Sequence, residues 1–271
     1  QAVAIGWSLL TFVLILRSAN YTKILISFLT FLILSDSRVD MMAFSGQAKI
    51  GAIVLLFGWV LLNFNKHRGY VNHIFKFFVP FLLLGIAASI WSQTPELAFQ
   101  KSISYSLIFF CIPIVLNAGL KDDEYMSSHI ILFLTSLFTI GIFSYIISPE
   151  FGTLAGRYRG LMGNPNGMGI LLTLTGPLYL LHKKIFPNHQ IARIPELIFL
   201  SSFVLSLILT GSRTSLFALL LFLFFVRIRY FSNAFSLILF IVIVVGYDYI
   251  LSSLPLLADM FGLKEYLRIE T

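Results

Sequence analysis

The segment Arg157–Asn166 (RYRGLMGNPN) places two arginines, two glycines and an Asn-Pro-Asn in a chain that is otherwise mostly apolar. Asn favours the N-cap of a helix and Pro its first position, because the proline nitrogen has no hydrogen that would be left unpaired there. We therefore predict that a helix begins near 165. Its positive dipole end and free N–H groups would lie beside this segment.

Such a segment is chemically suited to a phosphate or a diphosphate. Glycines at 160, 163, 167 and 169 allow the backbone to approach a ligand closely. A helix N-terminus and arginine side chains both attract phosphate oxygens. The segment therefore predicts an anion site.

A second cation lies in the short turn Leu209–Ser215 (LTGSRTS), between two apolar runs. Its Arg213 would sit at the membrane interface, where a charged group is costly unless it faces a partner or a wet cavity. A single interfacial arginine often reaches lipid phosphates instead. The functional interpretation therefore depends on Arg157, Arg159 and Arg213 acting together.

A third turn, Trp91–Glu96 (WSQTPE), opens with an aromatic residue and contains a proline that begins a helix. The simplest interpretation of Trp91 is an aromatic anchor at the membrane interface. Contact with a substrate is the alternative.

The elements that carry these turns are those of a polytopic membrane protein. Of the 271 residues, 58% are hydrophobic and only 11% charged, and the mean hydropathy is +0.91. The net charge of +7 comes from basic residues scattered between apolar runs, which is typical of membrane-surface loops and not of a nucleic-acid partner. The single cysteine, Cys111, excludes a disulfide framework and a cysteine metal site within this sequence.

Apolar runs separated by polar breaks predict an all-α bundle of about ten spans in the lipid bilayer. The runs lie near 2–16, 21–34, 48–64, 74–90, 102–118, 130–148, 168–181, 196–210, 214–226 and 234–251.

Alternating loops divide the basic residues into a set of eleven and a set of eight. The positive-inside tendency makes the larger set cytoplasmic, so Arg157, Arg159 and Arg213 fall on the outer side against this bias. We interpret the five histidines as cytoplasmic surface groups. Glu196 is taken as a first-turn acid favoured by its helix dipole, and Asp248 as a solvated residue at a helix end.

Three motifs in this order, Trp91-Ser-x-x-Pro95, Arg157-x-x-Gly160-x-x-Gly163-Asn-Pro-Asn166 and Thr210-Gly-Ser-Arg213, resemble the O-antigen ligase and O-antigen polymerase family of bacterial envelope glycosyltransferases. The resemblance spans 91–251. Residues 1–90 supply only transmembrane helices of unspecific sequence, and 252–271 would begin a large external loop.

The resemblance implies a glycosyltransferase-C-like fold and an inverting transferase without metal or cofactor. The donor would be an undecaprenyl-diphosphate-linked glycan, and the acceptor a glycan or a lipid A-core. The site would face the periplasm from the bacterial inner membrane. Arg157 and Arg213 match the family's diphosphate-engaging arginines. The substrate-binding candidates are Arg159, Gly160, Asn164, Asn166, Ser212 and Trp91.

One departure concerns the histidine that the family uses to activate the acceptor. It belongs to the external loop beginning near Ser252, and no histidine follows there before Thr271. Because the sequence begins with Gln1 and stops abruptly, we expect an excerpt of a longer protein, with the general base beyond 271. Two alternatives would also explain the missing histidine. The sequence could be a fragment that binds the donor without catalysis, or the topology could differ from the one predicted here.

A transporter or flippase of a lipid-linked glycan or another anion is the competing function. Such proteins are built from internal repeats and carry charged residues near mid-span. No convincing repeat is present, and the arginines lie at one face only, which favours the enzyme.

Overall fold

The computed structural model describes residues 1–37, 44–70, 75–187 and 190–228, together with single residues between 235 and 246. Over these residues the chain is all-α apart from one short β-hairpin. In chain order the elements are α1 (Ala2–Arg17), α2 (Tyr21–Asp36), α3 (Phe44–Leu62), α4 (Phe64–His67), the 3-10 helix η2 (Arg68–Tyr70), α5 (Phe75–Ile90), α6 (Pro95–Asp122), α7 (Met126–Ile147), α8 (Pro149–Gly152), β1 (Thr153–Leu154), β2 (Arg157–Tyr158), α9 (Pro165–Ile185), α10 (Arg193–Thr210) and α11 (Arg213–Ile228).

Nine of the ten predicted spans coincide with helices, namely α1 to α3, α5 to α7 and α9 to α11. The tenth, 234–251, lies almost entirely outside the described residues, as do Asp248 and the segment 252–271. Apolar runs therefore located the helices well, with boundaries that differ by up to seven residues.

Within the described residues, four helices are long and apolar enough to cross a membrane: α3, α6, α7 and α10. Helix α1 and the apolar parts of α5 and α11 are shorter. Large apolar side chains point outward throughout, including Val54, Leu84, Ile140 and Ile208, each at least 52% exposed. Such a surface suits lipid and not water, so an all-α membrane protein is supported. Ten spans and the glycosyltransferase-C-like arrangement remain predictions.

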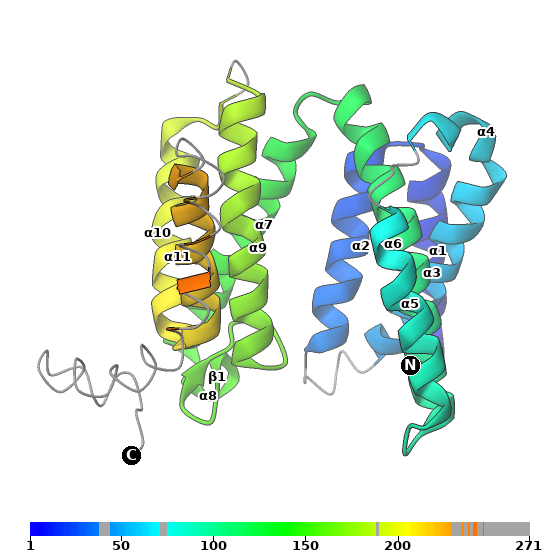
Figure 1. The fold of residues 1–271 in the computed structure, drawn as a ribbon, viewed down its shortest axis with the longest axis horizontal. Coiled ribbons are helices and arrows are strands. Elements are labelled where there is room, and N and C mark those ends of the chain that lie inside the picture. Colours follow the sequence, from blue (N-terminus) through cyan, green and yellow to red (C-terminus); the bar gives the residue numbers. More distant parts are fainter. Residues whose placement is uncertain are drawn as a thin grey trace, which may run out of the picture.

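The helices form two groups that stand side by side (Figure 1). Helix α3 packs against α1, α2 and α6 in the first group, and α5 packs against α6. In the second group α7 packs against α9 and α10, and α9 also packs against α11. Helices α2 and α6 of the first group contact α7 of the second. The groups therefore divide between α6 and α7.

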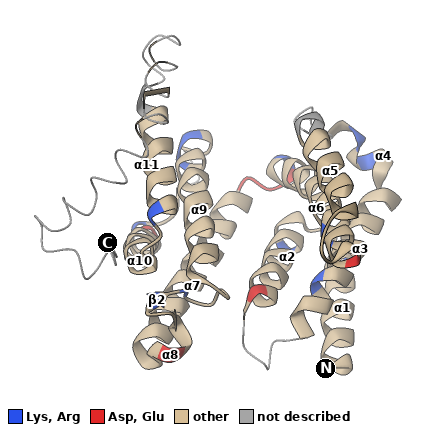
Figure 2. Cartoon of the chain, turned by 60° about the horizontal axis from the view of Figure 1, so that its bottom comes forward, with Lys and Arg blue, Asp and Glu red and all other residues tan. Residues whose placement is uncertain are grey.

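Consecutive long helices run in opposite directions, so alternate connections gather at the same end of the molecule (Figure 1). One end, here called the hairpin end, holds the C-terminus of α2, the α5–α6 turn, the β-hairpin and the α10–α11 turn. Lys, Arg, Asp and Glu colour mainly helix ends and connections, while the helix middles are almost free of them (Figure 2). This distribution agrees with membrane-spanning helices and with the predicted alternation of loops.

The interpretation of the histidines as surface groups is wrong for two of them. His67 is fully buried, with Nε2 3.1 Å from the hydroxyl of Tyr21. His182 is 2% exposed, and its Nδ1 lies 2.8 Å from the hydroxyl of Ser127. Hydroxyl partners from other helices make this burial tolerable, and no sequence pattern reveals such partners. His129 is exposed. His73 and His189 lie outside the described residues.

Candidate functional site

The β-hairpin projects Arg157 from the hairpin end. Strands β1 and β2 pair antiparallel, with Leu154 opposite Arg157. Ala155 and Gly156 between them have φ angles of +50° and +71°. Two successive positive φ values match the two-residue turn that suits a tight hairpin. The turn thus returns the chain directly to the arginine.

Tyr158 anchors this hairpin to α7. Its side chain is 2% exposed, and its ring packs edge-to-face on Tyr145 with centroids 5.7 Å apart. A Cβ at Gly141 of α7 would lie 2.6 Å from the Tyr158 hydroxyl oxygen, so only glycine leaves room for it. Burial raises the pKa of Tyr158, and the hydroxyl stays protonated at neutral pH. Tyr158 was not identified from the sequence, because attention went to the charged residues on either side of it.

Arg157 links the hairpin to two helices of the second group. Its Nε donates to the carbonyl oxygen of Thr210 at 3.0 Å, at the C-terminus of α10. Its Nη2 donates to Oδ1 of Asn166 at 3.3 Å, in the first turn of α9. The negative end of the α10 dipole favours a cation at this position. Arg157 is therefore a fixed cation between a helix C-terminus and a helix N-terminus.

Arg159 is directed elsewhere. Its Nε donates to the carbonyl oxygen of Phe151 in α8 at 3.0 Å, and its guanidinium carbon lies 6.0 Å from the centre of the Phe151 ring. Arg157 and Arg159 therefore bond to different helices, α10 and α8. The described contacts of Arg159 hold α8 and do not reach Asn166 or Thr210.

Helix α9 starts where the sequence predicted. Asn164 is its N-cap and accepts from the N–H of Gly167 at 2.7 Å, and Pro165 holds the first helical position. The N–H of Gly163 donates to Oδ2 of Asp36 at 2.9 Å. Two N–H groups that were expected to face a ligand are thus bonded inside the protein. Asn166 is exposed, beside Arg157.

The turn between α10 and α11 lies against Arg157. Gly211 adopts a left-handed conformation with φ +56°, and a Cβ placed on it would lie 3.7 Å from Nε of Arg157. Arg213 follows as the first residue of α11 and is exposed. The structure therefore brings the two arginine-bearing turns into contact.

Ser212 lies beneath this turn. It is 6% exposed, and its Oγ is 2.8 Å from Oγ of Ser215. Both serines pack on Gly169 of α9, where a Cβ would collide with them. Thr173 adds a hydrogen bond to the carbonyl oxygen of Ser215 at 3.2 Å. In this structure Ser212 therefore joins α9 to α11 and is not open to a ligand.

Two other candidates do not join Arg157. Gly160 is buried, with φ +57°, against Tyr158 and Met168, so its glycine allows the hairpin to pack. Trp91 is 80% exposed in the α5–α6 turn, which belongs to the first helix group (Figure 1).

Two surface grooves lie in the first helix group, away from these arginines. One, of about 310 Å³, is formed by α3 and α6. The other, of about 300 Å³, is formed by α1, α2 and the start of α3. Among the described residues, no three His, Cys, Asp or Glu side chains lie close enough to hold a metal ion.

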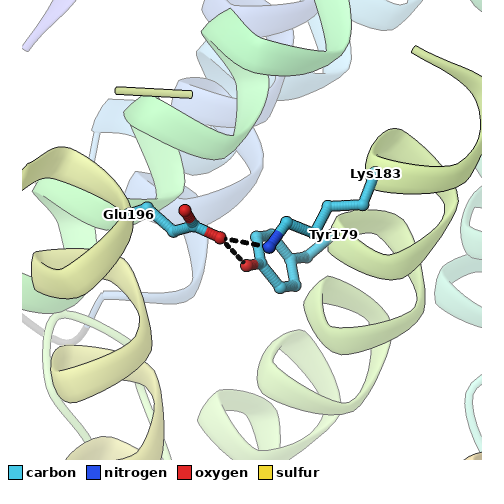
Figure 3. A network of polar contacts seen from close by, with 3 residues as sticks. All are labelled: Tyr179, Lys183 and Glu196. Atoms are coloured by element: carbon cyan, nitrogen blue, oxygen red, sulfur yellow. Dashed lines mark hydrogen bonds and ion pairs between the residues drawn. The ribbon is translucent and has the colours of Figure 1, made fainter. Parts of the chain in front are cut away.

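A polar cluster ties α9 to α10 away from the hairpin end. Lys183 and Tyr179 of α9 both point to the carboxylate of Glu196 on α10 (Figure 3). Nζ of Lys183 lies 2.5 Å from Oε1 of Glu196, and the Tyr179 hydroxyl donates to the same oxygen. Glu196 is therefore more than the dipole-favoured acid that the sequence suggested, since it pairs with two side chains of a neighbouring helix.

Comparison with known proteins found no family model, no curated protein and no solved structure that matches this chain. The resemblance to O-antigen ligases and polymerases therefore depends on the motif residues alone. Arg157, its contacts and the turn of Arg213 are the features on which a functional proposal can be based.

Proposed function

We propose that this chain is the membrane part of a bacterial glycosyltransferase of the O-antigen ligase or polymerase type. It would transfer glycan from an undecaprenyl-diphosphate-linked donor to a second glycan or to a lipid A-core. The reaction would take place at the periplasmic face of the inner membrane, where we expect the hairpin end of the molecule to lie.

The observation that carries this proposal is the placement of Arg157. Its guanidinium is fixed by the carbonyl oxygen of Thr210 and by Asn166, so it lies between the two cation-bearing turns of the motif. Positive charge held in place before the ligand arrives costs no reorganisation during reaction. This is the arrangement expected for a group that binds a diphosphate.

The chemistry needs such cations because of the leaving group. Transfer breaks the bond between the sugar and the diphosphate, and negative charge builds on an oxygen of a group that is already anionic. Arg157 and Arg213 would stabilise that charge more strongly in the transition state than in the bound donor. The acceptor hydroxyl must lose a proton to a base, which we expect outside this sequence.

The proposal is tested by replacing each arginine in the full-length protein and measuring glycan transfer in membranes. We expect Arg157→Ala and Arg213→Ala each to lower transfer by about a hundredfold or more, as for other charge-stabilising donors. Lys101→Ala is the matched control, because Lys101 is an exposed cation in the first turns of α6 at the same end. Normal transfer by either arginine variant, at equal protein levels, would refute the assignment.

A second assay of the same protein distinguishes an enzyme from a transporter. Purified protein in detergent micelles has no compartments, so it can transfer glycan but cannot transport it. We expect transfer from a polyprenyl-diphosphate-linked glycan under these conditions when the whole protein and an acceptor are supplied. Donor movement across vesicles without any transfer in micelles would instead favour the flippase.

A further inference from the structure

A carboxylate from the first helix group contacts the arginine-bearing segment of the second group. Asp36 is the last residue of α2, and its Oδ2 accepts from the N–H of Gly163 at 2.9 Å. The two residues are 127 positions apart in the sequence. Gly163 immediately precedes Asn164, the N-cap of α9. The carboxylate therefore bonds directly to the turn that starts this helix.

The fit between α2 and this turn is close. A Cβ at Gly163 would collide with the carbonyl oxygen of Asp36, and a Cβ at Gly167 would lie 3.3 Å from Oδ2 of Asp36. Both the backbone and the side chain of Asp36 thus touch the start of α9. The glycines at 163 and 167, which the sequence assigned to a ligand, make room for α2.

Helix α2 also bonds to a carboxylate near its other end. Oγ1 of Thr22 donates to Oδ2 of Asp123 at 2.5 Å, in the connection between α6 and α7. Thr22 and Asp36 are fourteen positions apart, which corresponds to about 21 Å along a helix. Of these two hydrogen bonds, the one to Asp36 reaches the segment that carries Arg157 and Asn166.

We propose that Asp36 is a positioning residue of the donor site. It fixes the turn at Gly163 from the opposite helix group, and through Asn164 it sets where the first turn of α9 meets Arg157. This proposal rests on the proposed function, because it assigns Asp36 a role in holding the diphosphate-binding segment.

The choice of a carboxylate has a physical reason. Hydrogen bonds from backbone N–H groups to an ionised oxygen are stronger than those to a neutral oxygen, and a helix N-terminus favours negative charge. Asn retains an oxygen that can accept from Gly163, whereas Ala retains none. Asp36→Asn therefore removes the charge and keeps an acceptor, whereas Asp36→Ala removes both.

The first experiment needs no activity. Hydrogen exchange of the peptide covering 160–168 is measured in full-length wild type, Asp36→Ala and Asp36→Asn. We expect exchange to rise by about tenfold or more in Asp36→Ala, as for loss of a hydrogen bond to a charged group, and less in Asp36→Asn. Unchanged protection in Asp36→Ala would overturn the proposal.

The second experiment measures glycan transfer per folded protein at varied donor concentration. We expect Asp36→Ala to lose about tenfold or more in kcat/KM, with Asp36→Asn retaining most of it. Asp123→Ala is the matched control, since it removes the carboxylate that bonds to α2 near its other end, and we expect its kcat/KM to stay near wild type. Equal losses in Asp36→Ala and Asp123→Ala would overturn the positioning role, because they would indicate general loosening of α2.

Parallel assays of Arg157→Ala separate this proposal from the proposed function. If Arg157→Ala retains wild-type transfer, the proposed function fails whatever Asp36 does. If Arg157→Ala loses transfer while Asp36→Ala retains it, only the role of Asp36 is overturned.

Discussion

Arg157 and Arg159 are two positions apart, yet they bind carbonyl oxygens of different helices. Arg157 donates to Thr210 of α10, and Arg159 donates to Phe151 of α8. The sequence assigned Arg157 to the diphosphate and Arg159 to substrate binding, within one cationic segment. Their contacts predict different roles.

Arg159→Ala should therefore cost much less transfer than Arg157→Ala. Its described partners lie in α8, so we expect a loss of about tenfold or less, through weaker packing of α8. Glycan transfer by the two variants at matched protein levels is the measurement. An equal loss in both would show that Arg159 shares the site.

Gly141 and Tyr158 form a second test at the residue scale. A Cβ at Gly141 would lie 2.6 Å from the Tyr158 hydroxyl oxygen, so Gly141→Ala should destabilise the protein by about 1–3 kcal/mol. Removing that hydroxyl with Tyr158→Phe should make room for the added methyl group. Thermal unfolding in detergent should thus show a smaller cost of Gly141→Ala in the Tyr158→Phe background. If Gly141→Ala cost the same stability in both backgrounds, the contact between Gly141 and the Tyr158 hydroxyl would be contradicted.

His67 predicts a pH dependence. Burial lowers its pKa below the ordinary value of 6.5, with the charge of Lys66 acting in the same direction and Asp122 against it. The folded state resists protonation of His67. The stability that neutral His67 contributes is therefore fully present above about pH 6.5 and is lost as the pH falls through its lowered pKa. The melting temperature should drop across this window, and His67→Gln should flatten the drop. The same slope in the variant would exclude His67 as its cause.

At the scale of elements, nine of the ten apolar runs coincide with helices, and Asn164-Pro165 predicted where α9 begins. Both signals are local, so one sequence contains them. The contacts of Asp36, His182 and Glu196 join residues distant in the chain, and local patterns carry no record of them. The sequence therefore identified the arginines and Asn166, but not that Arg157 bonds to Asn166 and to the carbonyl oxygen of Thr210.

The cluster of Tyr179, Lys183 and Glu196 is a contact between two elements. The Lys183 side chain is 45% exposed, so its ion pair should contribute about 1 kcal/mol or less. We expect Glu196→Gln to lower the melting temperature slightly and to leave transfer unchanged. Glu150→Gln, at an exposed acid of α8, should have no effect on melting. A large loss of transfer in Glu196→Gln would give this cluster a functional role.

At the scale of the whole molecule, the alternation of the helices together with the positive-inside tendency predicts that the hairpin end faces the outside of the membrane. Cys111 is the single cysteine of this sequence, so Cys111→Ser removes its background labelling before a new cysteine is introduced. A membrane-impermeant thiol reagent should label Glu150→Cys from outside and should label Lys184→Cys only after the membrane is opened. Glu150 and Lys184 are exposed on α8 and at the far end of α9, respectively. The reverse pattern would invert the topology.

The contact between α2 and the start of α9 has a consequence for recognising such proteins. A search pattern written from Arg157 to Arg213 would accept any chain that carries the two arginine turns. It would not include Asp36, because that residue lies far upstream in a segment without a distinctive motif. A gene fragment lacking its first helices would then match the pattern while missing the carboxylate that bonds to Gly163 within it.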